Sequence, residues 1–140
     1  MTPKPRILVT GSTGLLGPYL LKAADQVGLV LGVARQGADI NVDLTDKNAT
    51  REAHKLNQSD IIIHAAGFTD VDACERDPDS AFKVNKESVS NLIEFLSPGT
   101  FFVYISTDQV YPDTTGLHIE GTENPINIYG RFREIDDQED

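Results

Sequence analysis

Residues 10–17 read Thr-Gly-Ser-Thr-Gly-Leu-Leu-Gly and lie between two segments of different periodicity. Before them, residues 6–10 (Arg-Ile-Leu-Val-Thr) are a continuous β-rich run, which is typical of a buried parallel strand. After them, apolar residues recur about every 3.6 positions, which predicts an amphipathic helix that begins near Gly14 or Leu15 and ends at Gly28. Pro18 fits this helix only in its first turn. A strand, a glycine-rich turn and a helix in this order predict the first unit of an α/β fold with a phosphate-binding turn.

The rest of the chain continues the alternation of strands and helices. Further strands are predicted over residues 29–34, 40–42, 60–64 and 101–106. A helix capped by Asp46 should run to about Leu56, and another should begin near Asp79 and end at Pro98-Gly99. This alternation predicts an α/β fold class, a Rossmann-type doubly wound parallel sheet of strand order 3-2-1-4-5. Ligands of such sheets bind at the carboxyl ends of the strands, near the switch between strands 1 and 4.

Length, composition and charge exclude several classes of protein. A chain of 140 residues that is 39% hydrophobic can bury one core. The net charge of −10 argues against nucleic-acid binding, and no segment approaches the ~18 apolar residues of a membrane span. One cysteine, Cys74, and no signal-peptide core suggest a reducing compartment, so we expect a cytoplasmic protein.

Five acidic residues lie among the last seven, so residues 1–133 carry only −5. We therefore expect a folded Rossmann-type domain over residues 1–131 and a disordered acidic tail over residues 132–140.

The glycines of residues 10–17 each have an expected role. Gly11 permits the tight turn, Gly14 lets the backbone approach a pyrophosphate, and Gly17 lets the helix pack closely on the sheet. The start of the helix adds free N–H groups and a partial positive charge. The spacing GxxGxxG meets the GxGxxG fingerprint only loosely, so glycines that serve only the strand–helix turn remain an alternative.

Several motifs together resemble the extended short-chain dehydrogenase/reductase family, most closely its dTDP-4-dehydrorhamnose reductase branch. They are the turn at 10–17, His64-Ala65-Ala66-Gly67, Thr69-x-Val71-Asp72-x-Cys74-Glu75, Val84-Asn85 with Asn91-Leu92, Ser106-Thr107-Asp108, and Pro125-Ile126-Asn127-Ile128-Tyr129-Gly130. The resemblance covers residues 6–131 and implies a Rossmann fold and an NAD(P)H-dependent reductase of a nucleotide-activated 4-keto-6-deoxy sugar, as in dTDP-rhamnose biosynthesis. It is compatible with a homodimer. It also suggests that Asn85 and Asn91 bridge strands through their side-chain amides.

The end of the second predicted strand bears on the choice of cofactor. An acidic residue there would bind an unphosphorylated ribose, whereas this chain has Arg35, whose guanidinium suits a 2′-phosphate. We therefore expect NADP(H) rather than NAD(H), with a merely solvated Arg35 as the alternative. By resemblance, Asp43 and Leu44 would flank the adenine. The full set of expected cofactor-binding residues is Gly11, Thr13, Gly14, Leu15, Leu16, Gly17, Arg35, Asp43, Leu44, Ala65, Ala66 and Gly67.

The resemblance also implies a catalytic set. A carbonyl reductase protonates the substrate oxygen while hydride arrives at carbon, and a tyrosine can do this when a nearby cation lowers its pKa. Tyr129 would be this acid, Thr107 would bind the substrate oxygen, and Asp108 would contact the substrate. The family places a lysine four residues after the tyrosine, where this chain has Arg133, which keeps the charge but not the shape. No metal site is expected.

Two further functions stay open beside the reductase. The first is a sugar-nucleotide epimerase or 4,6-dehydratase. By resemblance, the dehydratases have the sequence Thr-Asp-Glu at this point, with acids that transfer protons. This chain has Gln109 in place of the glutamate, which argues against a dehydratase. The second is a non-catalytic nucleotide-binding or regulatory module, a role that the regulatory subunit of methionine adenosyltransferase exemplifies on this scaffold. Arg133 favours the second, as does the acidic end of the chain, where we expect the family's C-terminal substrate region to be missing.

Overall fold

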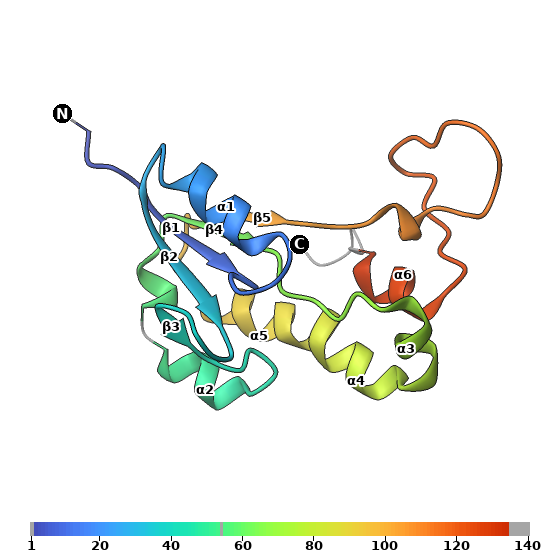
Figure 1. Cartoon of the computed structure of the whole chain (residues 1–140), viewed down its shortest axis with the longest axis horizontal. Helices are drawn as coiled ribbons and strands as arrows, with labels where there is room; N and C mark the ends of the chain where they lie inside the picture. Colours follow the sequence, from blue (N-terminus) through green and yellow to red (C-terminus); the bar gives the residue numbers. More distant parts are fainter. Residues whose placement is uncertain (1, 54, 135–140) are drawn as a thin grey trace.

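The computed structural model describes residues 2–53 and 55–134, with a five-stranded parallel sheet at its centre (Figure 1). The strands are β1 (Arg6–Thr10), β2 (Leu29–Ala34), β3 (Ile40–Asn41), β4 (Ile61–His64) and β5 (Phe101–Tyr104). Their order is β3-β2-β1-β4-β5, and every neighbouring pair is parallel. The predicted fold class and strand order are therefore confirmed. β3, β4 and β5 are one or two residues shorter than predicted.

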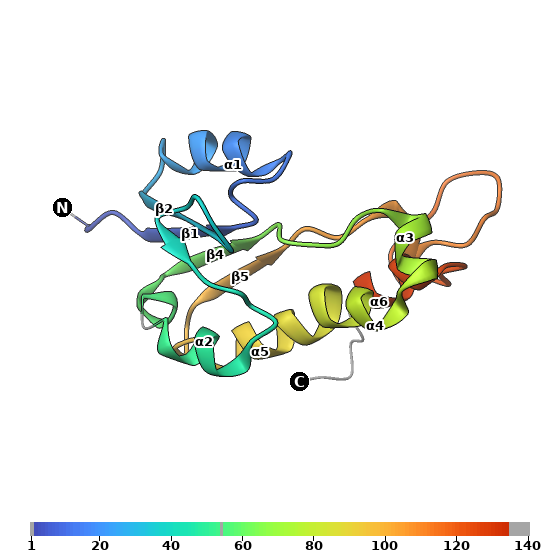
Figure 2. The same cartoon turned by 60° about the horizontal axis from the view of Figure 1, so that its bottom comes forward.

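Helices cover both faces of the sheet. They are α1 (Gly17–Ala24), α2 (Lys47–Glu52), α3 (Val71–Arg76), α4 (Pro78–Phe82), α5 (Ser88–Glu94) and α6 (Ile128–Arg133), with two 3₁₀ segments, η1 (Leu56–Gln58) and η3 (Asp108–Val110), and one π-helical segment, η2 (Lys83–Glu87). Figure 2 shows α1 on one face and α2 and α5 on the other. α4, η2 and α5 follow one another directly and lead from the sheet to α3 and α6 (Figures 1 and 2). No helix within the described residues is both long and apolar enough to span a membrane.

The first helix differs from its prediction. It begins at Gly17 instead of near Gly14 or Leu15, because residues 11–16 form a turn in which Gly14 N–H donates to Gly11 O at 3.0 Å. Leu15 is consequently 94% exposed, and Tyr19 is 72% exposed. The buried part of α1 is its second half, where Ala24 packs against Ile7 and Val9 of β1.

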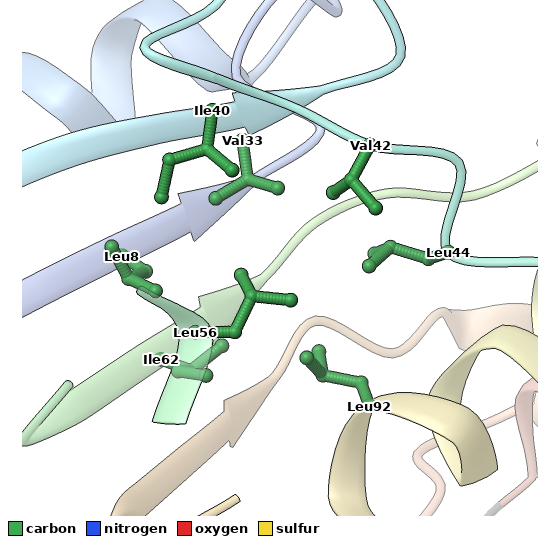
Figure 3. Packing of buried hydrophobic residues seen from close by; sticks show 8 residues of the cluster. All are labelled: Leu8, Val33, Ile40, Val42, Leu44, Leu56, Ile62 and Leu92. Carbon is green, nitrogen blue, oxygen red and sulfur yellow. The ribbon is translucent and has the colours of Figure 1, made fainter. Parts of the chain in front are cut away.

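The largest core cluster lies between the sheet and the layer of α2 and α5 (Figure 3). It contains Leu8, Val33, Ile40, Val42, Leu44, Leu56, Ile62 and Leu92. Successive side chains of a strand point to opposite faces of the sheet. Ile7 and Val9, which flank Leu8 in the chain, therefore pack with α1 on the other face. The buried parallel sheet predicted from the apolar runs is thus covered on both faces.

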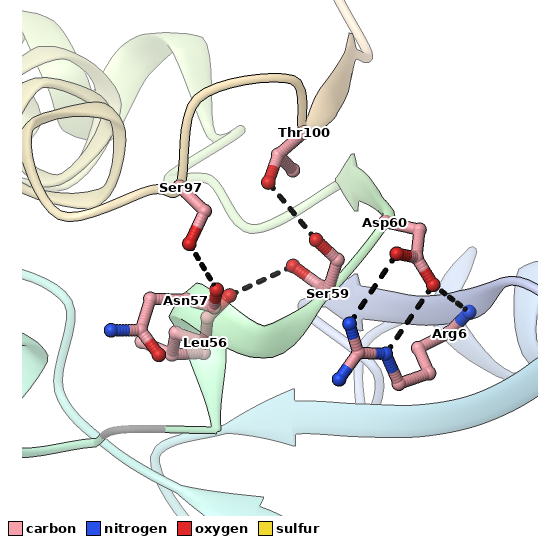
Figure 4. A network of polar contacts seen from close by, with 7 residues as sticks. All are labelled: Arg6, Leu56, Asn57, Ser59, Asp60, Ser97 and Thr100. Atoms are coloured by element: carbon pink, nitrogen blue, oxygen red, sulfur yellow. Dashed lines mark hydrogen bonds and ion pairs between the residues drawn. The ribbon is translucent and has the colours of Figure 1, made fainter.

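Polar contacts tie together the amino ends of the central strands (Figure 4). Asp60 accepts the backbone N–H of Arg6 at 2.7 Å and pairs with its guanidinium at 3.3 Å. Next to this pair, Thr100 Oγ1 donates to the carbonyl of Ser59 at 2.9 Å. These contacts hold together the amino-terminal ends of the strands, at the opposite end of the sheet from the carboxyl ends.

The end of the described chain is helical up to Arg133, so the boundary expected at residue 132 falls inside α6. Phe132 packs edge-to-face on Phe82 with 5.5 Å between ring centroids, and Arg133 is 3% exposed. These two residues belong to the packed molecule because their side chains find partners on α4 and on the sheet. The rest of the expected tail, residues 135–140, lies outside the described residues.

Candidate functional site

A groove of about 520 Å³ lies at the carboxyl ends of the strands, near the neighbouring strands β1 and β4. Its walls include eight of the expected cofactor-binding residues: Gly11, Thr13, Gly14, Arg35, Asp43, Leu44, Ala66 and Gly67. Leu15, Leu16, Gly17 and Ala65 do not line it. This position is the switch point at which open α/β sheets bind their ligands.

The glycine turn is compressed between β4 and α1. Gly11 has a φ of +67°, and a Cβ there would lie 2.7 Å from the backbone N of Ala66. A Cβ on Gly17 would overlap the carbonyl oxygens of Gly11 and Ser12, so Gly17 lets the start of α1 lie close to the turn rather than to the sheet itself. Gly14 is exposed at the groove. The turn therefore presents bare backbone to the groove.

The backbone after Gly14 suits an anion. The N–H groups of Leu15, Leu16 and Gly17 have no acceptor among the described residues, and no side chain caps α1. Free N–H groups and the helix dipole give the start of a helix a partial positive charge. Leu15 and Leu16 can thus contribute through their amides although their side chains point to solvent. This stretch fits the pyrophosphate of a dinucleotide.

Arg35 marks one end of the groove. It is exposed at the end of β2, and the nearest acid, Asp39, is committed elsewhere because it accepts the N–H of Gly32 at 2.7 Å. Asp43 Oδ1 accepts both the hydroxyl and the N–H of Thr45, at 2.7 and 2.9 Å. These two bonds, with a smaller effect of the Arg35 charge, hold the pKa of Asp43 below its usual value. Asp43 is therefore a fixed, ionised acceptor beside a guanidinium.

Two buried asparagines hold the loops on either side of the groove. Asn85, in the π-helical segment, accepts the N–H of Phe68 at 2.9 Å and donates to its carbonyl at 3.0 Å. Asn91 donates to the carbonyl of Leu44 at 3.0 Å. The expectation that these amides bridge strands is wrong in its target, because they bind the loops after β4 and β3 and not the strands themselves.

Some groove residues were not predicted as site residues. They are Val33, Ala34, Val42, Thr45, Phe68, Ser80, Val84 and Ser88. Ser80, Val84 and Ser88 are spaced by four residues, so the helical period alone could have placed them on one face. Val33 and Val42 looked like ordinary core residues.

His64 organises the turn after β4. Thr10 Oγ1 accepts the N–H groups of Ala65 and Ala66, each at 3.2 Å, and lies 2.8 Å from His64 Nδ1. Burial disfavours the charged form of the ring, so His64 is neutral, and its Nε2 has no hydrogen-bond partner among the described residues. Complete burial, with a smaller effect of the Arg133 charge, lowers the pKa of His64 to about 3.

Arg133 reaches from α6 to the ends of two strands. Its guanidinium donates to the carbonyl of Ala66 at 3.3 Å and to the carbonyl of Ile105, and it lies 4.6 Å from the ring centroid of Tyr104. A Cβ on Gly67 would meet Arg133 Nη1 at 3.0 Å, so the guanidinium touches the wall of the groove. Arg133 makes no hydrogen bond to Tyr129.

The other predicted catalytic residues lie where η3 meets α6. Tyr129 is 7% exposed and packs with Cys74 and Ala81. Thr107 Oγ1 accepts the N–H of Gln109 at 3.2 Å and donates to Asp108 at 3.3 Å. The Thr107 hydroxyl is therefore engaged in hydrogen bonds to its neighbours in the chain. The phenol of Tyr129 is packed among apolar residues and has no hydrogen-bond partner among the described residues.

Gln109 is part of the same junction. Its side-chain oxygen accepts from Asn127 Nδ2 at 2.9 Å, while Asn127 Oδ1 caps α6 by accepting the N–H of Gly130 at 2.7 Å. A Cβ on Gly130 would overlap the carbonyl of Gln109. Asn127 and Gly130, on either side of Tyr129, thus hold α6 against η3.

A parallel sheet of order 3-2-1-4-5 with a glycine turn at its switch point defines a Rossmann-type nucleotide-binding fold. Residues 5–135 match the family described as RmlD substrate binding domain, and the chain belongs to this family. Both statements agree with the resemblance found in the sequence.

Relatives with different names match the chain. The methionine adenosyltransferase 2 subunit beta of Bos taurus is 35% identical over 138 residues, which cover 94% of this chain and 41% of that protein. The dTDP-4-dehydrorhamnose reductase of Streptomyces griseus is 31% identical over 131 residues, which cover 91% of this chain and 42% of that protein. The chain therefore spans less than half the length of these relatives.

Solved structures agree. A hypothetical dTDP-4-dehydrorhamnose reductase from Sulfolobus tokodaii superposes with a TM-score of 0.82 at 33% identity, over 91% of this chain and 49% of that one. The dTDP-4-dehydrorhamnose reductase of Bacillus anthracis, in complex with NADP, superposes with a TM-score of 0.80 at 26% identity, over 95% of this chain and 48% of that one.

Proposed function

We propose that this chain binds NADP(H) and is the cofactor-binding part of a reductase of a nucleotide-activated 4-keto-6-deoxy sugar, similar to dTDP-4-dehydrorhamnose reductase. The observation that carries the proposal is the groove at the switch point, which is lined by Gly11 and Gly14 of the glycine turn and by Arg35, with the free N–H groups of residues 15–17 directly after that turn. Relatives named as such reductases, one of them in complex with NADP, support it.

In this proposal the chain's own residues bind and orient. Arg35 pairs with a 2′-phosphate, the amides of residues 15–17 bind the pyrophosphate, and Asp43 accepts from the adenine amine. The cofactor, when bound, supplies hydride to the substrate carbonyl carbon. Tyr129 is the proposed donor of the proton to the carbonyl oxygen, with Thr107 and Asp108 beside the substrate.

A non-catalytic nucleotide-binding module is the second candidate, and the position of Arg133 favours it. The guanidinium is bound to two backbone carbonyls and makes no hydrogen bond to Tyr129, which is the arrangement of a structural arginine. The relative named as a subunit of methionine adenosyltransferase is consistent with such a role. Both candidates share the cofactor groove and differ in turnover.

Calorimetric titration of the folded chain with NADPH and NADH tests the shared claim. We expect NADPH to bind more tightly than NADH, and adenosine 2′,5′-bisphosphate, which carries the groups that would contact Arg35, to compete with it. Binding of neither dinucleotide at millimolar concentration would overturn the proposal. Oxidation of NADPH with a 4-keto sugar nucleotide then separates the reductase from the binding module.

A further inference from the structure

Arg133 is a buried cation without a buried counter-charge. It is 3% exposed, its Nε has no hydrogen-bond partner, and its other donors bind the neutral carbonyls of Ala66 and Ile105. Within residues 2–53 and 55–134, the ion pairs are Arg6–Asp60 and Lys47–Glu94, so no described carboxylate pairs with Arg133. An unpaired charge away from water acts strongly on whatever charge comes near it.

The order of the strands places this cation at one particular end of the groove. Arg35 follows β2, the glycine turn follows β1, Ala66 and Gly67 follow β4, and Arg133 bridges the ends of β4 and β5. A dinucleotide with its 2′-phosphate at Arg35 and its pyrophosphate at the glycine turn must direct its nicotinamide half toward β4 and β5. That half therefore approaches the wall formed by Gly67, against which the Arg133 guanidinium lies.

The two redox states of the cofactor differ in charge at that half. The oxidised nicotinamide ring carries a positive charge, and the reduced ring is neutral. We infer that Arg133 is a specificity-determining residue whose unpaired charge makes the groove bind reduced NADPH in preference to NADP⁺. This inference rests on the proposed binding of NADP(H), and it concerns the redox state that the groove selects. The neutral ring of His64 stacks on Tyr104, so these neighbours of Arg133 bring no negative charge that would cancel the effect.

The test compares the dissociation constants of NADPH and NADP⁺, each measured by calorimetry without substrate or turnover. The wild-type chain should bind NADPH about tenfold more tightly, which corresponds to about 1.4 kcal/mol. Arg133→Gln removes the charge and keeps a donor for one carbonyl, so it should bring the ratio close to one. Arg133→Lys should keep the preference. Arg131→Gln, an exposed arginine on the same helix, is the matched control and should leave the ratio unchanged.

The ratio distinguishes an electrostatic role from a structural one. If Arg133 only fastened α6 to the strands, its loss would weaken both cofactors equally and leave the ratio intact, and that result would overturn the inference. A wild-type ratio below about threefold would also overturn it, even if Arg133→Gln did not fold. Failure of both cofactors to bind would instead refute the proposed function.

Discussion

Single side chains decide what each end of the groove can hold. At the adenosine end, the carboxylate of Asp39 accepts the N–H of Gly32, and that of Asp43 accepts from Thr45. Arg35 is the exposed basic residue that follows β2 and lines this end of the groove. That Arg35 follows the second strand could be predicted from the sequence. The hydrogen bond of Asp39 to Gly32 could not, because it depends on how the chain folds back on β2.

Arg35→Asp should weaken NADPH binding by about 1–3 kcal/mol, because it removes charge-assisted bonds to the 2′-phosphate and adds repulsion. NADH, which lacks that phosphate, should bind with little change. Arg76→Asp, the same charge change at an exposed position on α3, is the control for long-range effects. An unchanged NADPH-to-NADH affinity ratio in Arg35→Asp would return Arg35 to the role of a solvated surface residue.

Buried His64 should make stability depend on pH. Its pKa is about 3 in the folded chain, below the ~6.5 of an unfolded chain, so the unfolded state binds the proton first as pH falls. Stability from this residue is present above pH ~6.5 and is lost below it by about 1.4 kcal/mol per pH unit, down to the folded pKa.

Urea unfolding at pH ~7 and pH ~5 measures this loss. Wild-type protein should lose about 2 kcal/mol more than His64→Asn, whose amide can still hydrogen-bond to Thr10 but does not titrate. This pH range lies above the unfolded pKa of carboxylates, so their contribution stays small. Equal losses in the two proteins would show that His64 is protonated in the folded state.

At the scale of elements, the sequence predicted β1, β2 and the strand order because long apolar runs and glycine punctuation are local signals. The start of α1 could not be predicted, since the turn before it is set by the approach of Gly11 to Ala66, 55 residues further along the chain. The short helix α3 and the π-helical segment were also missed. Both depend on contacts with loops, such as the bonds of Asn85 to Phe68.

Gly11→Ala tests the compressed turn, with Gly99→Ala as its matched control. Both glycines have positive φ, +67° and +91°, but a Cβ at Gly99 meets nothing within 4 Å. Gly99→Ala should therefore cost about 1 kcal/mol of backbone strain, and Gly11→Ala about 3 kcal/mol or more, because its Cβ collides with the backbone of Ala66. Chemical denaturation measures both, and similar costs would show that the turn has room to adjust.

At the scale of the whole molecule, the described chain forms a groove at the switch point of the sheet, and its Arg133 and Tyr129 make no hydrogen bond to each other. The resemblance assigned catalytic roles to residues at η3 and on α6; these two elements contact each other, and the roles themselves stay predictions. It could not predict that Arg133 would bind the ends of β4 and β5, since this depends on where the α6 side chains find acceptors. The cytoplasmic location and a homodimer stay predictions.

The 140-residue chain should show little or no reductase turnover. Arg133 is held by two carbonyls, and these 140 residues match only 42% of the Streptomyces griseus relative, so contacts from the rest of such a protein would not position the sugar carbonyl in this assay. Arg133→Lys alone should rescue little, whereas Arg133→Lys joined to the C-terminal part of the Streptomyces griseus relative should rescue much more. NADPH oxidation with a 4-keto sugar nucleotide measures this, and brisk turnover by the unmodified chain would show that Arg133 can serve in catalysis.

A crystal structure of the chain with NADPH tests the central claim, a dinucleotide groove at the switch point, most directly. The account predicts the pyrophosphate on the amides of Leu15, Leu16 and Gly17, the 2′-phosphate at Arg35, and the nicotinamide half beside Gly67. A cofactor bound outside this groove, or with its adenosine end at β4 and β5, would contradict it.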